Sequence, residues 1–151
     1  REEFEAEITG YLEELNIDLI CLAGFMRLLT EEFVNRWRDR ILNIHPSLLP
    51  AFKGLHVHER AIESGARFTG CTVHFVRPEM DNGPIIAQAA VPILETDTPE
   101  ELAARILEQE HQIYPLALRL VAEGRVKIHG PRAMIERAHE QTLSLLNPKV
   151  E

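Results

Sequence analysis

The order in which helix-like and strand-like segments follow one another leaves few folds open to this chain. Amphipathic helical patterns alternate with short apolar or β-branched runs, and no internal repeat or linker interrupts them. This alternation predicts one α/β domain over residues 1–151, with a mainly parallel sheet, helices on both faces and an antiparallel extension. We expect helices over 2–15, 30–38, 56–63 and 98–124, and strands over 17–23, 40–44, 69–76, 84–94 and 125–128.

The helix after residue 97 has the strongest local signals. Thr98 and Glu101 have the spacing of a capping box, and Pro99 suits the first turn. Gly124 is the expected end of the helix, and Pro115 is expected to kink it because proline cannot donate a backbone hydrogen bond. Residues 129–151 form a weakly patterned tail, and the sequence does not give its structure.

Asn43 and His45 stand at the end of a short apolar run and are followed at once by Pro46 and Pro50. Two residues apart in an extended strand, both side chains point to the same face. The prolines stop the strand and stiffen the loop. An amide that donates beside an imidazole that carries a proton near neutral pH can form a catalytic site. The simpler interpretation, two turn residues, is favoured by this spacing alone.

Three polar loops favour the site interpretation over that simpler one. They cover residues 24–29, 43–54 and 77–83, and each follows a predicted strand. Ligands of open α/β sheets bind beyond the carboxyl ends of the strands, where such loops meet. In the third loop Asp81 is a turn residue by default, but a carboxylate facing His45 would favour the protonated imidazole. In the first loop Arg27, otherwise a surface residue, would bind an anion or a polar ring.

Composition excludes several other classes. The net charge of −8 argues against broad nucleic-acid binding, which needs a basic surface. Cys21 and Cys71 both lie in apolar runs, so we expect buried free thiols in a reducing cytoplasm. No apolar run is long enough to cross a membrane. His56, His58 and the other histidines lack the spacing of a ligand set, so we expect no metal site.

Several segments in order resemble the folate-dependent formyltransferases, and most closely their purine-pathway members, the phosphoribosylglycinamide formyltransferases. The resemblance covers roughly residues 1–128. It rests on the segments 21–29 (CLAGFMRLL), 43–54 (NIHPSLLPAFKG), 72–76 (TVHFV), 81–84 (DNGP) and 108–115 (EQEHQIYP). It implies a Rossmann-like formyltransferase fold. It also implies an enzyme that moves the formyl group of 10-formyltetrahydrofolate, a co-substrate, to the amine of glycinamide ribonucleotide.

The same resemblance implies a role for particular residues. The catalytic residues would be Asn43, His45 and Asp81. The residues near the folate would be Arg1, Met26, Arg27, Leu28, Leu29 and Asn43. Glu110 would lie near the ribonucleotide, although its position in a charged helical stretch alone predicts a solvated helix face.

One departure from the family concerns the beginning of the chain. Family members open with a strand and a loop at a helix start that holds the ribonucleotide phosphate. Nothing before Arg1 supplies it, so we expect a chain truncated at its N-terminus by about one βαβ unit. Two alternatives stay open: a formyltetrahydrofolate hydrolase, in which water replaces the amine, and an inactive folate-binding module. Nothing in the sequence distinguishes a monomer from a homodimer.

Overall fold

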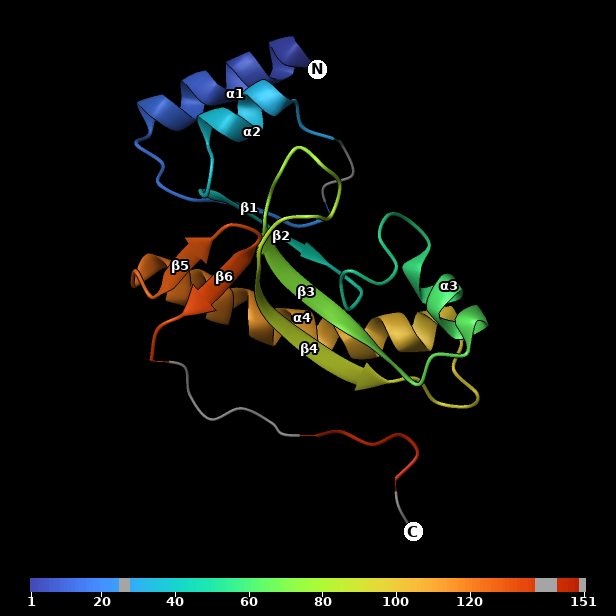
Figure 1. Cartoon of the computed structure of the whole chain (residues 1–151). Coiled ribbons are helices and arrows are strands. Elements are labelled where there is room, and N and C mark those ends of the chain that lie inside the picture. Colours follow the sequence, from blue (N-terminus) through green and yellow to red (C-terminus); the bar gives the residue numbers. More distant parts are fainter. Residues whose placement is uncertain (25–27, 138–143, 150–151) are drawn as a thin grey trace.

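Over the residues that the structure describes, the protein is an α/β structure with one four-stranded sheet and one short separate hairpin (Figure 1). The computed structural model describes residues 1–24, 28–137 and 144–149. The elements are α1 (Glu2–Glu14), β1 (Ile20–Leu22), α2 (Glu31–Arg36), β2 (Ile41–His45), α3 (Val57–Ser64), β3 (Phe68–Phe75), β4 (Ile85–Pro92), α4 (Pro99–Ala122), β5 (Val126–His129) and β6 (Arg132–Ile135).

The main sheet has the order β1-β2-β3-β4. The pair β1 and β2 is parallel, and β2–β3 and β3–β4 are antiparallel. The predicted α/β class with an antiparallel extension is confirmed. The described sheet is not mainly parallel, because β1 and β2 are its one parallel pair. The extension makes up two of the three strand pairs in the described sheet, and β3 and β4 are its longest strands.

Helices cover both faces of the sheet, as the alternation of side chains along β2 makes clear. Leu42 and Ile44 pack into the larger apolar core, which the buried side of α4 completes through Leu102, Ile106, Ile113, Ala117 and Leu120. Ile41 points the other way and packs with Phe33 and Trp37 of the α2 region. Figure 1 shows α4 behind β3 and β4, with α1 and α2 together at the opposite side.

The helix α4 begins as its sequence predicts. Thr98 accepts a hydrogen bond from the Glu101 N–H, and the Glu101 carboxylate accepts from the Thr98 N–H. This reciprocal pairing satisfies two backbone groups that a helix start otherwise leaves open. The helix continues as one element through Pro115, which lies on its exposed side.

The expectation about the first strand of the sheet is wrong. The strand predicted over 17–23, buried on both faces, is the three-residue β1, and Cys21 is exposed because β1 lies at an edge of the described sheet. The weakly patterned tail over 129–151, whose structure the sequence left open, contains β6, which pairs with β5 across a turn at Gly130. No helix of the described residues is long and apolar enough to cross a membrane.

Candidate functional site

Asn43 and His45 lie on the same face of β2, as their spacing predicts. This face is opposite to the one that Leu42 and Ile44 pack against α4. In the antiparallel pairing with β3, Asn43 stands opposite His74 and His45 stands opposite Thr72. Opposed residues of antiparallel strands share a face, so these four side chains form one polar band on the sheet. Among the described residues, no hydrogen bond occupies the Asn43 amide. It is half-buried and free to donate to a ligand.

The His45 ring lies between two oxygen atoms. Its Nε2 is 2.9 Å from the carbonyl oxygen of Phe52, and its Nδ1 is 3.6 Å from Oδ2 of Asp81. A carbonyl and a carboxylate only accept, so the doubly protonated imidazolium is the form that can donate to both. The 3.6 Å separation is longer than a normal hydrogen bond, which leaves the Nδ1 proton able to engage a third oxygen. Both side chains are about nine-tenths buried.

Two backbone features fix the position of Asp81: its own left-handed conformation and a hydrogen bond from the loop after β2. Asp81 adopts a left-handed conformation with φ of 51°, which is uncommon outside glycine. Its Oδ2 accepts a hydrogen bond of 2.9 Å from the Gly54 N–H, so one carboxylate oxygen faces both the loop and His45. Gly83 is fixed by close approach, since a Cβ there would stand 1.6 Å from the Phe75 carbonyl oxygen.

A buried hydroxyl of β3 and a side-chain amide of β4 hold the loop after β2 against the sheet. Thr72 Oγ1 donates to the Ser47 carbonyl at 2.7 Å and accepts from the Leu49 N–H at 3.1 Å. It also accepts from Gln88 Nε2 at 3.0 Å, and the same amide donates to the Leu49 carbonyl at 3.0 Å. Thr72 and Gln88 thus hold residues 47 and 49 of this loop, and Ser47 Oγ in turn donates at 3.1 Å to the Phe52 carbonyl that contacts the His45 ring. The sequence interpretation missed Thr72 and Gln88.

His74 is a second buried imidazole beside the site. It is 2% exposed, and its Nδ1 lies 2.8 Å from the carbonyl oxygen of Phe75. That carbonyl accepts, so Nδ1 carries the proton and Nε2, which has no partner among the described residues, presents a lone pair. Burial lowers the pKa of His74 below its ordinary value. It is therefore a neutral ring on the same face as Asn43.

The expected folate residues fall in and beside the segment that follows β1. Arg1 Nη1 donates to the Leu28 carbonyl at 3.2 Å, and Leu28 is exposed. Leu29 is half-buried and packs on the apolar cluster of Phe33. The other two residues assigned to the folate, Met26 and Arg27, lie outside the described residues.

Glu110 is more enclosed than a solvated helix face would be. It is half-buried on α4, and desolvation raises the pKa of its carboxyl group, while His111 and His45 act in the opposite direction. Glu110 is thus within electrostatic range of His45. Burial and, to a smaller degree, Glu110 raise the pKa of the Cys71 thiol to about 12, so Cys71 stays protonated.

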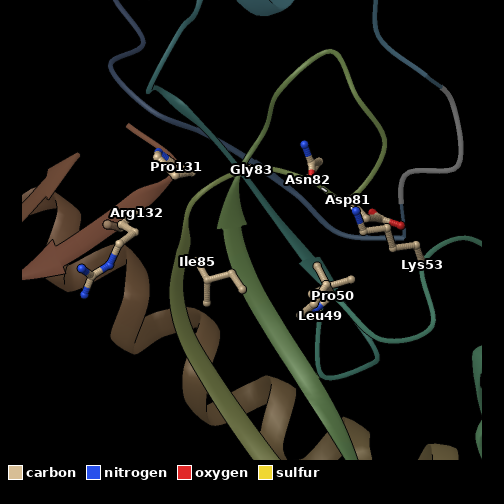
Figure 2. A pocket seen from close by; sticks show the side chains of 10 residues that line it. Leu49, Pro50, Lys53, Asp81, Asn82, Gly83, Ile85, Pro131 and Arg132 are labelled. Carbon is tan, nitrogen blue, oxygen red and sulfur yellow. Dashed lines mark hydrogen bonds between the residues drawn. The ribbon is translucent and has the colours of Figure 1, made fainter. Parts of the chain in front are cut away.

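A cavity of about 360 Å³ adjoins the site (Figure 2). Residues of two loops, of the start of β4 and of the hairpin of β5 and β6 line it: Leu49, Pro50, Lys53, Asp81, Asn82, Gly83, Ile85, Pro131, Arg132 and Ala133. Asp81 reaches its wall, whereas Asn43 and His45 do not line it. Across the described residues, no group of three or more His, Cys, Asp or Glu side chains could hold a metal ion.

Comparison with known proteins relates the chain to one family. The family described as formyl transferase matches residues 1–118. The chain is 54% identical over 128 residues to the trifunctional purine biosynthetic protein adenosine-3 of Gallus gallus. This match covers 85% of this chain and 13% of that protein. It is 48% identical over 134 residues to the phosphoribosylglycinamide formyltransferase of Haemophilus influenzae. This match covers 89% of this chain and 63% of that protein.

A solved structure gives the same relation for the fold. Glycinamide ribonucleotide transformylase 1 from Symbiobacterium toebii superposes with a TM-score of 0.87 at 54% identity. The match covers 90% of this chain and 64% of that one. The chain therefore spans a small part of the trifunctional protein and somewhat less than two thirds of these two bacterial proteins.

Proposed function

The chain belongs to the formyl transferase family, and we propose that it transfers the formyl group of 10-formyltetrahydrofolate to the amine of glycinamide ribonucleotide. The observation that carries this proposal is the position of Asn43 and His45. The two side chains share one face of β2, and the Asp81 carboxylate stands 3.6 Å from the His45 ring. We also propose that this reaction takes place in the cytoplasm and is a step of purine synthesis.

The proposed reaction begins with attack of the ribonucleotide amine on the formyl carbon. The carbonyl π electrons move to the formyl oxygen, which becomes negatively charged in a tetrahedral intermediate. The Asn43 amide and the His45 Nδ1–H both donate to this oxygen, and each such donor contributes about 3 kcal/mol of transition-state stabilisation. Asp81 faces Nδ1 of His45 at 3.6 Å and orients the ring.

Collapse of the intermediate completes the transfer. The electron pair returns from the oxygen to the carbon, and the bond between that carbon and N10 of the folate breaks. The attacking amine loses one proton and N10 gains one, so the charges balance. His45 or a bound water relays this proton.

The two substrates are proposed to bind to different groups of residues. Arg1 supplies a cation for a carboxylate of the folate, and Leu28 and Leu29 supply apolar surface beside Asn43. Glu110, whose carboxylate lies within electrostatic range of His45, binds the ribonucleotide from the α4 side.

An assay of the natural full-length protein tests the proposal. It contains 10-formyltetrahydrofolate with or without glycinamide ribonucleotide, and it follows the absorbance of the folate product. Product that depends on the ribonucleotide supports the transferase. Product formed equally without it identifies the hydrolase. Folate binding without product in either mixture identifies an inactive folate-binding module.

A further inference from the structure

The first helix holds one buried charge. Of α1, which is described over its whole length, Glu5 is the residue that is buried, with 5% exposure. A buried carboxylate is costly unless its oxygens accept hydrogen bonds. Both oxygens of Glu5 accept hydrogen bonds from Thr30: Oε1 from the backbone N–H at 2.8 Å, and Oε2 from the hydroxyl.

The partner of this carboxylate is the residue that caps α2. Thr30 Oγ1 accepts a hydrogen bond of 3.2 Å from the Phe33 N–H, as a helix cap does. In the complete capping box of α4, the third helical residue is Glu101, which bonds back to the N–H of the cap. In α2 the third residue is Phe33, which is needed in the apolar cluster and carries no acceptor. Glu5 supplies the missing carboxylate from another helix.

This arrangement joins α1 to the edge of the site at two points. Thr30 follows directly on Leu28 and Leu29, and the Leu28 carbonyl accepts from Arg1, one helical turn before Glu5. The segment starts beyond the carboxyl end of β1, whose Leu22 stands opposite Asn43 in the parallel pair. The first turns of α1 therefore hold residues 28–30, which follow β1 in the chain.

We propose that Glu5 is a positioning residue for the pocket of the formyl donor. Glu5 touches no substrate. It fixes Thr30 and, through it, the position of Leu28 and Leu29 relative to Asn43. The inference rests on the proposed function, because it assigns these leucines to the folate side of that site. Loss of the Glu5 carboxylate is expected to weaken binding of the donor, with little effect on the amine substrate or on the chemical step.

The test compares Glu5 with Glu101. Each carboxylate accepts a hydrogen bond from the backbone N–H of a threonine that caps a helix, Thr30 for α2 and Thr98 for α4. Glu5→Ala removes the acceptor at α2, and Glu101→Ala removes the matching acceptor at α4, whose capping box lies far from Asn43 in the chain. Kinetics of the full-length protein should give at least a fivefold higher KM for 10-formyltetrahydrofolate in Glu5→Ala. The KM for glycinamide ribonucleotide and kcat should stay within twofold. Glu101→Ala should lower Tm and leave all three constants unchanged.

Two further measurements separate positioning from general loss of stability. Amide hydrogen exchange at Thr30 should be at least tenfold faster in Glu5→Ala, because its N–H loses its acceptor. Glu5→Gln keeps one oxygen for the Thr30 N–H, so its donor KM should lie between those of the wild type and Glu5→Ala. This variant also provides the measurement if Glu5→Ala does not fold.

The outcomes distinguish this inference from the proposed function. Wild-type protein that transfers no formyl group overturns the proposed function, and the inference with it. Wild-type transfer with an unchanged donor KM in the Glu5 variants overturns the inference alone. So does unchanged exchange at Thr30, or an equal rise in donor KM in Glu101→Ala.

Discussion

Replacement of Asp81 by asparagine removes a charge from the site and keeps its shape. The asparagine oxygen can still accept from the Gly54 N–H at 2.9 Å, so the loop keeps its anchor. What is lost is the negative charge 3.6 Å from Nδ1 of His45. At an effective dielectric constant of about 20, two unit charges at that distance attract by about 4 to 5 kcal/mol.

The expected kinetic loss is smaller than this attraction. Part of the interaction is screened by solvent, and the dipole of the new amide replaces another part of it, which leaves about 3 kcal/mol. Since each 1.36 kcal/mol is a factor of about ten in rate, kcat for Asp81→Asn should fall by about 10²-fold. The KM for 10-formyltetrahydrofolate should change by less than about threefold, because Asp81 acts on His45 in the reaction step.

Steady-state kinetics with both substrates varied measures the two constants separately. Asp97→Asn is the matched control, since Asp97 is a buried carboxylate bonded to Arg105 at the start of α4. It should lower Tm and leave kcat unchanged. A kcat within threefold of wild type in Asp81→Asn would remove the His45–Asp81 pair from the mechanism.

Three further variants test the supports of the site. Thr72→Val removes a buried hydroxyl with three hydrogen bonds and should cost about 2 kcal/mol in urea unfolding. It should also lower kcat, and unchanged kcat would show that the loop keeps its position without this hydroxyl. Burial lowers the pKa of His74, so below pH 6.5 the unfolded chain binds a proton that the folded chain does not, and stability falls as the pH is lowered. His74→Gln should make the loss of unfolding free energy between pH 7 and pH 5 shallower, and an equally steep loss would assign it to other groups. Gly83→Ala places a Cβ 1.6 Å from the Phe75 carbonyl oxygen and should lower Tm strongly, whereas Gly10→Ala in α1 meets no atom within 4 Å and should raise it slightly. Equal shifts of Tm would contradict the close approach at Gly83.

Local patterns predicted the parts of the site that lie close together in the chain. The shared face of Asn43 and His45 follows from strand alternation, and the helix of Thr98 follows from its capping box. The contact of Asp81 with His45 has another cause than the three-loop argument gives. Because β3 is antiparallel to β2, its carboxyl end at Phe75 stands opposite Leu42 near the start of β2, and the loop after β3 leads back to His45.

Long-range pairing decided what the sequence could not predict. Thr72 and Gln88 serve the site because the antiparallel registers of β2, β3 and β4 place them beside the loop after β2. Those registers include an irregularity at His74 that no local pattern encodes. Glu5 is one of several glutamates in α1, and the sequence pattern alone assigns all of them to the solvent-exposed face. Its contact with Thr30, 25 residues away, distinguishes Glu5 from the others.

The hairpin of β5 and β6 had a signal that the sequence analysis did not use. Gly130 and Pro131 stand between two short stretches that alternate outward and inward, which is typical of a hairpin turn. In contrast, the exposure of Cys21 depends on the edge position of β1, and its apolar neighbours could not reveal that position.

Following the formyl carbon itself tests the central claim most directly. The natural full-length protein is mixed with 10-formyltetrahydrofolate labelled with ¹³C in the formyl group and with glycinamide ribonucleotide, and the label is located by NMR. The account predicts that the label leaves the folate and appears as a formamide on the ribonucleotide amine, at a rate strongly reduced in Asp81→Asn. Label recovered as free formate, or label that stays on the folate, would contradict it.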